Sequence, residues 1–143
     1  MTACGENSIK MNKPFQKVVA AVIFDEQENI LITKRMPDSH LGGYWEFPGG
    51  QVEENESKTH ALIRELKEET GLDICVEKKF MQETFDYEIK IVHLIFYLCR
   101  LCPATQDIEK REISDFRWVK KDELNNYKFP PADEAIIGKL IKL

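Results

Sequence analysis

The 143-residue sequence lacks any apolar run of the roughly 18 residues that a membrane-spanning helix needs. Its first residues, MTACGENSIKMNK, have no apolar core of the kind that a secretory signal carries. A basic excess is also missing, since the net charge is −5 and proteins that bind nucleic-acid polymers normally present a basic face. We therefore expect a cytoplasmic protein whose partners include neither a membrane nor a nucleic-acid polymer.

Cysteine is scarce, and its arrangement does not indicate a metal site. Cys99 and Cys102 have C-x-x-C spacing, but no second pair and no histidine partner completes a zinc set. They end an apolar segment with strand character, in which side chains three positions apart point to opposite faces. We expect these two cysteines, together with Cys4 and Cys75, to be ordinary reduced, partly buried thiols.

The chain has no repeat, low-complexity tract or interdomain linker. Its length suits one domain, and 43% hydrophobic residues suffice for an ordinary core. Residues 1–14 are polar and end at a proline, so we expect them to form a flexible extension. Residues 15–143 then form the single domain, as a monomer, with a dimer left open.

Hydrophobic patterning predicts a chain of strands with a few helices. The apolar run at 18–24 favours a buried strand, and 30–35 suits its return strand after a polar turn. Glycine and proline mark a loop at 36–44 and a break at 48–50. Further strands are predicted at 44–47, 51–53, 74–76, 80–88, 90–102 and 115–119, with a charged loop at 104–111. Helices are predicted at 57–70, at 121–126 and from Pro131, which suits a first helical position. The fold class is α/β, with a mixed sheet between helices.

The helix predicted at 57–70 carries most of the information about function. Ser57 or Asn55 can cap its start, and Gly71 stands where a left-handed cap ends a helix. At about 100° per residue, Glu68 and Glu69 fall within about 60° of Glu65, so three carboxylates share one stripe. The neighbouring core face is formed by Leu62, Ile63 and Leu66.

This acidic stripe suits a divalent cation better than plain solvation. Pairs of like charge at i,i+3 and i,i+4 are unfavourable by about 0.2–0.5 kcal/mol each, and a solvated face usually mixes lysine among its acids. Carboxylate oxygens are hard ligands of the kind Mg²⁺ takes, usually together with substrate phosphates.

The stretch from Gly50 to Leu72 resembles the Nudix box at every fixed position. The matching residues are Gly50, Glu56, Arg64, Glu65, Leu66, Glu68, Glu69, Gly71 and Leu72. Segments at 32–35, 45–50 and 129–140, with Trp118, extend the resemblance to the MutT-type nucleoside triphosphate pyrophosphohydrolases. The resemblance implies an α/β/α sandwich and hydrolysis of a nucleoside diphosphate linkage with Mg²⁺, or Mn²⁺ as a substitute.

The resemblance also implies the metal and catalytic residues. The metal ligands would be Glu65, Glu68, Glu69, the carbonyl of Gly49 and, from a distant loop, Glu112. Glu65 is our choice of general base, with Glu68 and Glu112 as alternatives. Arg64 is expected to orient a carboxylate, either Glu56 or Glu65, rather than to touch phosphate.

A second group of residues is expected to meet the substrate. Arg35 could bind phosphate as a charged donor, and Phe47 could stack on a base, although a core position is the competing interpretation. By resemblance, His40, Glu46, Pro48, Gly49 and Lys90 border the nucleotide. His93 is instead interpreted as a satisfied core histidine.

Asp133 departs from the family pattern. The matching residue in enzymes specific for 8-oxo-dGTP is asparagine, whose amide donates to O6 of the base and accepts from N7–H. An ionised aspartate only accepts, which would suit the exocyclic amine of cytosine. A raised pKa would give Asp133 a donor again.

These residues predict an enzyme that hydrolyses nucleoside triphosphates to the monophosphate and pyrophosphate. Sanitation of the nucleotide pool by removal of 8-oxo-dGTP comes first, and hydrolysis of CTP or 5-methyl-dCTP is the alternative that Asp133 favours. A non-catalytic nucleotide-binding regulator and a structural adaptor are the other classes. Both explain the retained acids poorly.

Overall fold

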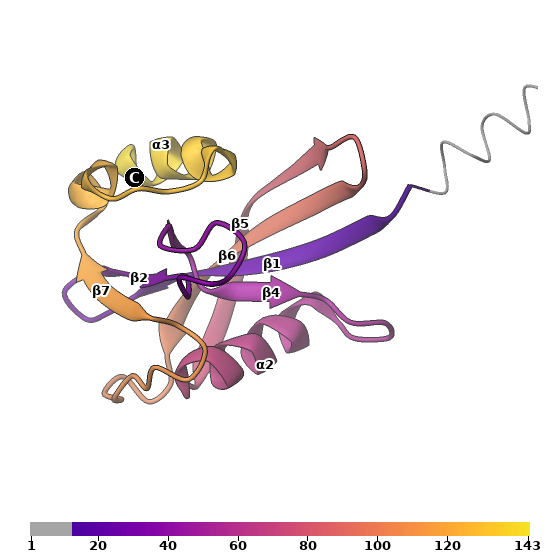
Figure 1. Ribbon diagram of the computed structural model, residues 1–143. Coiled ribbons are helices and arrows are strands. Elements are labelled where there is room, and N and C mark those ends of the chain that lie inside the picture. Colours follow the sequence, from indigo (N-terminus) through magenta and orange to yellow (C-terminus); the bar gives the residue numbers. More distant parts are fainter. Residues whose placement is uncertain (1–12) are drawn as a thin grey trace, which may run out of the picture.

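A computed structural model describes residues 13–143, in which a seven-stranded sheet lies between two α-helices (Figure 1). The strands are β1 Phe15–Phe24, β2 Ile30–Lys34, β3 Trp45–Glu46, β4 Gly49–Gln51, β5 Ile74–Asp86, β6 Ile91–Leu101 and β7 Asp115–Val119. The helices are α2 Lys58–Thr70, α3 Glu134–Ile141 and the 3-10 helices η1 Lys121–Asn126 and η2 Pro131–Asp133. Helix α2 covers one face of the sheet and α3 the other, so the expected α/β/α sandwich is confirmed.

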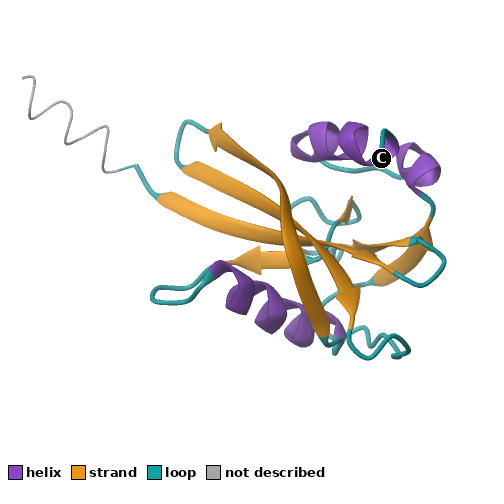
Figure 2. Ribbon diagram, turned by 180° about the vertical axis from the view of Figure 1, so that it is seen from behind, coloured by secondary structure: helices purple, strands orange, loops and turns teal. Residues whose placement is uncertain are grey.

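The sheet is mixed because one pair of its strands is parallel. Its order is β3-β2-β1-β6-β5, with β4 also paired to β1 and β7 to β2. Strands β1 and β6 run parallel along their whole length, from Phe15 opposite Ile91 to Phe24 opposite Arg100, and the other pairs are antiparallel (Figure 2). Strand β1 therefore lies at the centre of the sheet, with β2 and β4 on one side and β6 on the other.

Alternation along β1 separates two cores. Val19, Ala21 and Ile23 belong to the core under α2, while Ala20 and Val22 belong to the core under α3. Because both faces of a strand in the middle of this sandwich are buried, its sequence is continuously apolar. This explains the uninterrupted run at 18–24, although the strand itself begins three residues earlier, at Phe15.

The capping of α2 agrees with its prediction. Ser57 Oγ accepts a hydrogen bond from the backbone N–H of His60 at 3.1 Å, and Gly71 takes the left-handed conformation with φ of 73°. The backbone N–H of Gly71 donates to Lys67 O at 3.0 Å. One assignment was wrong: Ile63, placed on the core face, is 43% exposed. At about 100° per residue it lies at the edge of that face, beyond the buried Leu66.

Two strand predictions need correction. Residues 48–50 were expected to break the chain before a strand at 51–53, yet Gly49–Gln51 forms β4. Residues 74–76 and 80–88 were expected as separate strands, yet β5 runs unbroken from Ile74 to Asp86. Irregularities in the β5–β6 pairing at 76/78 and 79/81 explain why its alternation is hard to follow in the sequence.

The prediction of reduced thiols was wrong for two of the four cysteines. Cys75 and Cys102 form a disulfide, with Cα atoms 5.7 Å apart and a sequence separation of 27. The pairing of β5 with β6 sets Ile74 opposite Leu101, and so brings the two cysteines together at this end of the hairpin. Cys99 is free and buried, as expected. Cys4 lies outside the described residues.

The predicted N-terminal extension falls mostly outside residues 13–143. The two of its residues that are described contact the β5–β6 hairpin. Lys13 Nζ lies 2.5 Å from Asp86 Oδ1, and the carbonyl of Pro14 accepts a hydrogen bond from Ile91 N at 2.8 Å. None of the helices within residues 13–143 has the length and apolar character needed to cross a membrane.

Candidate active site

Two glycines let the acidic helix approach the sheet. In β4, Gly49 lies opposite Ala20 and Gly50 opposite Val19 of β1. A Cβ atom at Gly49 would overlap the carbonyl oxygen of Val19, and one at Gly50 would overlap the carboxylate of Glu65. Close approach of the β1 backbone therefore requires glycine at 49, while glycine at 50 leaves room for the Glu65 carboxylate directly against the backbone of the sheet.

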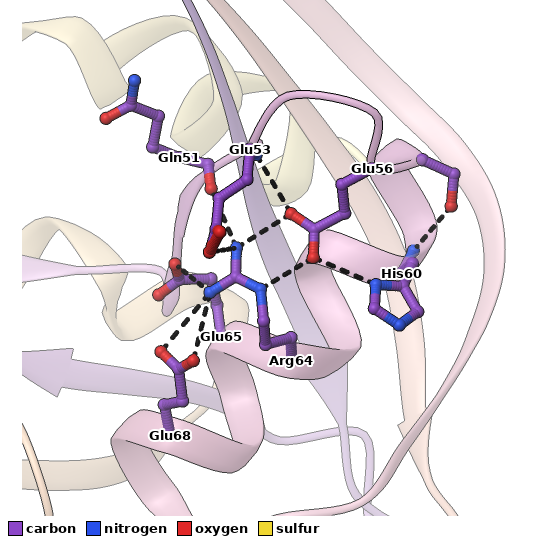
Figure 3. A network of polar contacts seen from close by, with 8 residues as sticks. Gln51, Glu53, Glu56, His60, Arg64, Glu65 and Glu68 are labelled. Carbon is purple, nitrogen blue, oxygen red and sulfur yellow. Dashed lines mark hydrogen bonds and ion pairs between the residues drawn. The ribbon is translucent and has the colours of Figure 1, made fainter.

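Arg64 organises the acids around it (Figure 3). Its Nε donates to Glu56 Oε2 at 2.7 Å and its Nη2 to Glu56 Oε1 at 2.9 Å, a two-pronged pair. Its Nη1 donates to Glu65 Oε1 at 3.0 Å and reaches both oxygens of Glu68, at 3.2 and 3.4 Å. The expectation that Arg64 orients carboxylates agrees with this geometry.

Three further groups in this network could not be assigned a role from the sequence. Gln51 O accepts from Arg64 Nη2 at 3.1 Å, and Glu53 Oε1 lies 3.3 Å from the same nitrogen. His60 Nδ1 lies 3.0 Å from Glu56 Oε2. The sequence signal for His60 was its i,i+4 spacing from Glu56, whereas the contacts of Gln51 and Glu53 depend on how β4 meets the helix.

The acids of the site fall into two electrostatic classes. Hydrogen bonds from Arg64 hold the pKa of Glu56 at about 2, and the surrounding acids raise the pKa of Arg64 itself. Burial, opposed by Arg64, raises the pKa of Glu65. Burial raises the pKa of Glu69 to about 9, reinforced by the charges of Glu46, Glu65 and Glu112. Glu56 is thus a fixed anion, whereas Glu65 and Glu69 lack a full counter-charge.

The donor set fits a divalent cation. Among residues 13–143, no group of three His, Cys, Asp or Glu side chains could hold an ion as the side chains now stand. However, the charge of Glu65 helps to raise the pKa of Glu69, and Glu69 Oε1 accepts a hydrogen bond of 3.3 Å from Gly49 N. Hard carboxylate oxygens that repel one another are the ligands that Mg²⁺ or Mn²⁺ takes.

The loop after β6 brings Glu112 to the same end of α2. Its backbone N–H donates to Glu69 O at 3.1 Å, and its charge contributes to the raised pKa values of Glu65 and Glu69. The Glu112 side chain is exposed. The charge run at 109–112 looked solvated in the sequence, and it is this backbone contact that places its last residue beside the helix acids.

Arg35 is engaged with protein groups. Its Nη1 lies 2.8 Å from Glu46 Oε1, and its Nε donates to the carbonyl of His40 at 2.6 Å. Burial raises the pKa of Glu46, and Arg35 opposes the shift. Sequence reasoning named Arg35 and Glu46 separately but missed their pairing, which joins the end of β2 to β3. A phosphate that bound Arg35 would compete with Glu46.

Asp133 also interacts electrostatically with Glu46. It ends η2 just before α3 and is 8% exposed. Burial raises its pKa to about 7, with a further contribution from the charge of Glu46. Glu46 thus interacts electrostatically with both Glu69 and Asp133, and connects the acidic stripe to the start of the C-terminal helix.

No hydrogen bond or ion pair with the acidic residues of α2 is seen for the remaining residues that were expected to meet the substrate, within the described part of the chain. Phe47 is 4% exposed and its ring packs on Phe129 at 5.3 Å and on Phe96 at 6.0 Å, in agreement with its alternative core position. Pro48 is buried, and its carbonyl accepts a hydrogen bond from β1. His40 lies in the exposed loop before β3. Lys90 lies in the turn between β5 and β6, level with the start of β1 rather than with β4.

His93 is satisfied, as expected, but it is half-buried and belongs to neither core, so its assignment as a core histidine was wrong. Its Nδ1 lies 2.9 Å from Thr84 Oγ1, and its ring stacks on Phe15 at 6.3 Å.

Comparisons with known proteins match most of the chain. The family profile described as the NUDIX domain matches residues 19–139. An 8-oxo-dGTP diphosphatase of Proteus vulgaris is 40% identical over 88 residues, which are 62% of this chain and 79% of the relative. A CTP pyrophosphohydrolase of Escherichia coli (strain K12) is 31% identical over 127 residues, covering 89% of this chain and 92% of the relative.

A solved structure supports the same assignment. The crystal structure of the MutT protein from Methanosarcina mazei Go1 superposes with a TM-score of 0.80 at 25% sequence identity. It covers 92% of this chain and 96% of that chain.

Proposed function

The chain belongs to the Nudix family of hydrolases, which act on phosphorus-containing anhydrides, and we propose that it is a Mg²⁺-dependent nucleoside triphosphate pyrophosphohydrolase. The observation that carries this proposal is the acidic stripe of α2, with Glu65 against Gly50 and Arg64 holding three acids in place. An acidic protein of net charge −5 repels a triphosphate unless cations intervene. A cation held by these acids reconciles the charge of the protein with an anionic substrate.

The protein groups divide the work of hydrolysis. Bound Mg²⁺ would neutralise phosphate charge and polarise water, held by Glu65, Glu69, Glu68, Glu112 and the Gly49 carbonyl. Glu65 takes the proton from the attacking water, whose oxygen bonds to the β-phosphorus while the bond from that phosphorus to the α–β bridging oxygen breaks. The products are the nucleoside monophosphate and pyrophosphate. Glu68 and Glu112 are the alternative bases.

The first candidate substrate is 8-oxo-dGTP, so the role would be sanitation of the nucleotide pool. The Proteus vulgaris relative of this name is 40% identical over 88 residues, 62% of the chain. The raised pKa of Asp133 supports it as well, because a neutral carboxylic acid both donates and accepts, as an asparagine amide does. It can therefore donate to O6 of the oxidised guanine and accept from N7–H.

The second candidate is a cytosine nucleotide, such as CTP or 5-methyl-dCTP. One observation favours it specifically: position 133 is aspartate, and in its ionised form it accepts from the exocyclic amine of cytosine. The relative named CTP pyrophosphohydrolase matches over 89% of the chain. With a pKa of about 7, Asp133 is partly ionised near neutral pH and so allows either base.

A substrate panel tests the proposal and separates the candidates. Initial rates would be measured for 8-oxo-dGTP, dGTP, CTP, dCTP and 5-methyl-dCTP with Mg²⁺, with chromatographic identification of the monophosphate and pyrophosphate. Glu65→Gln is the control, and should lower turnover at least about 100-fold while leaving the melting temperature nearly unchanged. Turnover of none of the five nucleotides, or full turnover by Glu65→Gln, would refute the proposal. Replacing Mg²⁺ by EDTA should abolish activity, and Mn²⁺ should restore it.

A further inference from the structure

The loop between β6 and β7 closes the C-terminal end of α2. The last carbonyls of a helix have no partner within the helix. Here Thr70 O accepts from Glu109 N at 2.9 Å, and Glu69 O accepts from both Arg111 N and Glu112 N at 3.1 Å. Both ribbon views show this loop beside the end of α2 (Figures 1 and 2). The position of Glu112 relative to the helix acids is therefore set by backbone hydrogen bonds from this loop to the last turn of α2.

Beyond the Cys75–Cys102 disulfide, which fixes the first residue of the loop, the side chain of Gln106 holds the loop to Asp73. Gln106 Oε1 accepts from Asp73 N at 2.8 Å, while Gln106 Nε2 donates to Asp73 O at 2.8 Å and to Pro103 O at 2.7 Å. The Gln106 amide thus pairs with both the N–H and the carbonyl of Asp73, as the backbone of a neighbouring strand would, and we call this pairing the Gln106 clip. Asp73 links α2 to β5, so this clip ties the loop to the connection that follows the helix.

Three further contacts hold the chain on either side of Gln106, between the disulfide and Glu112. Cys102 N donates to Asp73 O at 3.1 Å, which fixes the chain before the clip. After it, Ile108 packs on the core under α2 and Arg111 Nη1 donates to Lys67 O at 3.1 Å. The segment from Gln106 to Glu112 is therefore anchored at its start by one amide and at its end by the helix terminus.

We propose that Gln106 is a positioning residue, which holds the loop so that Glu112 stays beside Glu65 and Glu69. The proposal rests on the proposed function in one respect, the participation of Glu112 in hydrolysis. Gln106 itself lies at the base of the loop and acts through Glu112. Its loss would let the loop move away from α2 and would lower the fraction of molecules with Glu112 in place.

Amide hydrogen exchange tests the clip without any activity measurement. In Gln106→Ala, exchange at Glu109, Arg111 and Glu112 should be at least about tenfold faster, because their amides are the ones that bond to α2, while α3 should be unchanged. Gln106→Glu should be as fast or faster, since its carboxylate faces the carbonyl oxygens of Asp73 and Pro103. Gln27→Ala, in the exposed β1–β2 turn, is the matched control. Unchanged exchange in Gln106→Ala would overturn the proposal.

A double-mutant cycle tests the route through Glu112. Gln106→Ala should lower kcat about three- to tenfold with KM within about twofold of wild type. Added to Glu112→Gln, it should cost almost nothing further, because the group that it positions is already gone. Multiplying effects, or full activity in Glu112→Gln, would overturn the proposal. If the wild-type protein hydrolyses no nucleotide, the proposed function fails, while the exchange experiment still decides the clip.

Discussion

Arg64 holds the carboxylate of Glu56 at both oxygens, 2.7 Å from Nε to Oε2 and 2.9 Å from Nη2 to Oε1. Glu56 precedes the N-terminus of α2, and Arg64 lies in its middle, so this pair ties the connection after β4 to the helix. The third guanidinium nitrogen of Arg64, Nη1, donates a hydrogen bond to Glu65. The rotamer of Glu65 is thus fixed by Gly50 on one side and by an arginine that is itself fixed by Glu56.

Arg64→Lys tests whether the two-pronged geometry matters beyond the charge. An ammonium group keeps the charge but cannot span Glu56 and Glu65 at once, so we expect kcat to fall about 10- to 100-fold. Arg117→Lys is the control, because Arg117 is exposed and pairs with Asp115. Steady-state kinetics and thermal melts of both variants provide the measurement. Wild-type kcat in Arg64→Lys would show that charge alone suffices.

Two glycines offer a matched comparison. In Gly50→Ala the new methyl group would occupy the place of the Glu65 carboxylate, so activity should fall at least about 100-fold, with a loss of stability of about 1–3 kcal/mol. In Gly138→Ala the methyl group enters open space within α3, and stability should rise by about 0.5–1 kcal/mol with activity unchanged. Urea denaturation and nucleotide turnover distinguish the two. An active Gly50→Ala would mean that Glu65 has another competent position.

Local signals in the sequence were sufficient for the acidic helix. Ser57 and Gly71 cap it as predicted, because capping depends on residues within a few positions of the helix ends. The stripe formed by Glu65, Glu68 and Glu69 follows from helical periodicity alone. The pairing of Arg64 with carboxylates was also expected, since the partners lie on the same helix or just before it.

Contacts between distant segments were not predictable in this way. The sequence predicted that Gly49 and Gly50 interrupt a strand, although they form part of β4. Glycine is favoured there because Val19 and the Glu65 carboxylate lie so close, and the local sequence does not reveal these contacts. The disulfide depends on the register of β5 with β6, which includes two irregularities. The clip at Gln106 depends on where the loop meets Asp73, 33 positions away.

The Cys75–Cys102 disulfide should contribute to stability through the unfolded state. Closing a loop of about 27 residues corresponds to about 3–4 kcal/mol in the chain-entropy treatment. Cys75→Ser with Cys102→Ser should therefore lower the midpoint of urea unfolding, and dithiothreitol should do so for the wild type but not for the double variant. Cys99→Ala, which alters a buried free thiol, is the control. Thiol titration of the denatured, unreduced wild-type protein should find two fewer thiols than after reduction; an equal number would contradict the disulfide.

Asp133 should make stability depend on pH with a sign opposite to that of a salt-bridged aspartate. Its pKa is about 7 in the folded protein against an ordinary value of 3.8, so the folded state binds the proton more tightly. This contribution is fully present below about pH 4 and is lost as pH rises through about 7, at most about 4 kcal/mol. Asp133→Asn should lose the part of the dependence that Asp133 contributes, while the other acids with raised pKa values keep theirs, and exposed Asp122→Asn should behave like the wild type. Urea midpoints at pH 5 and pH 8 provide the comparison; a wild type that gains stability relative to Asp133→Asn as pH rises would contradict the assignment.

Ionisation of Asp133 should also change which nucleobase the enzyme prefers. Below about pH 7 neutral Asp133 donates and accepts, as 8-oxoguanine requires, and above it the carboxylate only accepts, as the cytosine amine requires. The ratio of kcat/KM for 8-oxo-dGTP to that for CTP should therefore fall about tenfold or more between pH 6 and pH 8. Taking a ratio removes the effects of pH on metal binding and on the general base, because both substrates share them. In Asp133→Asn the ratio should favour 8-oxo-dGTP and stay constant with pH, because an amide does not titrate. A constant ratio in the wild type would mean that Asp133 does not contact the nucleobase. The preference of the enzyme for one nucleobase would then have to come from other side chains around Glu46.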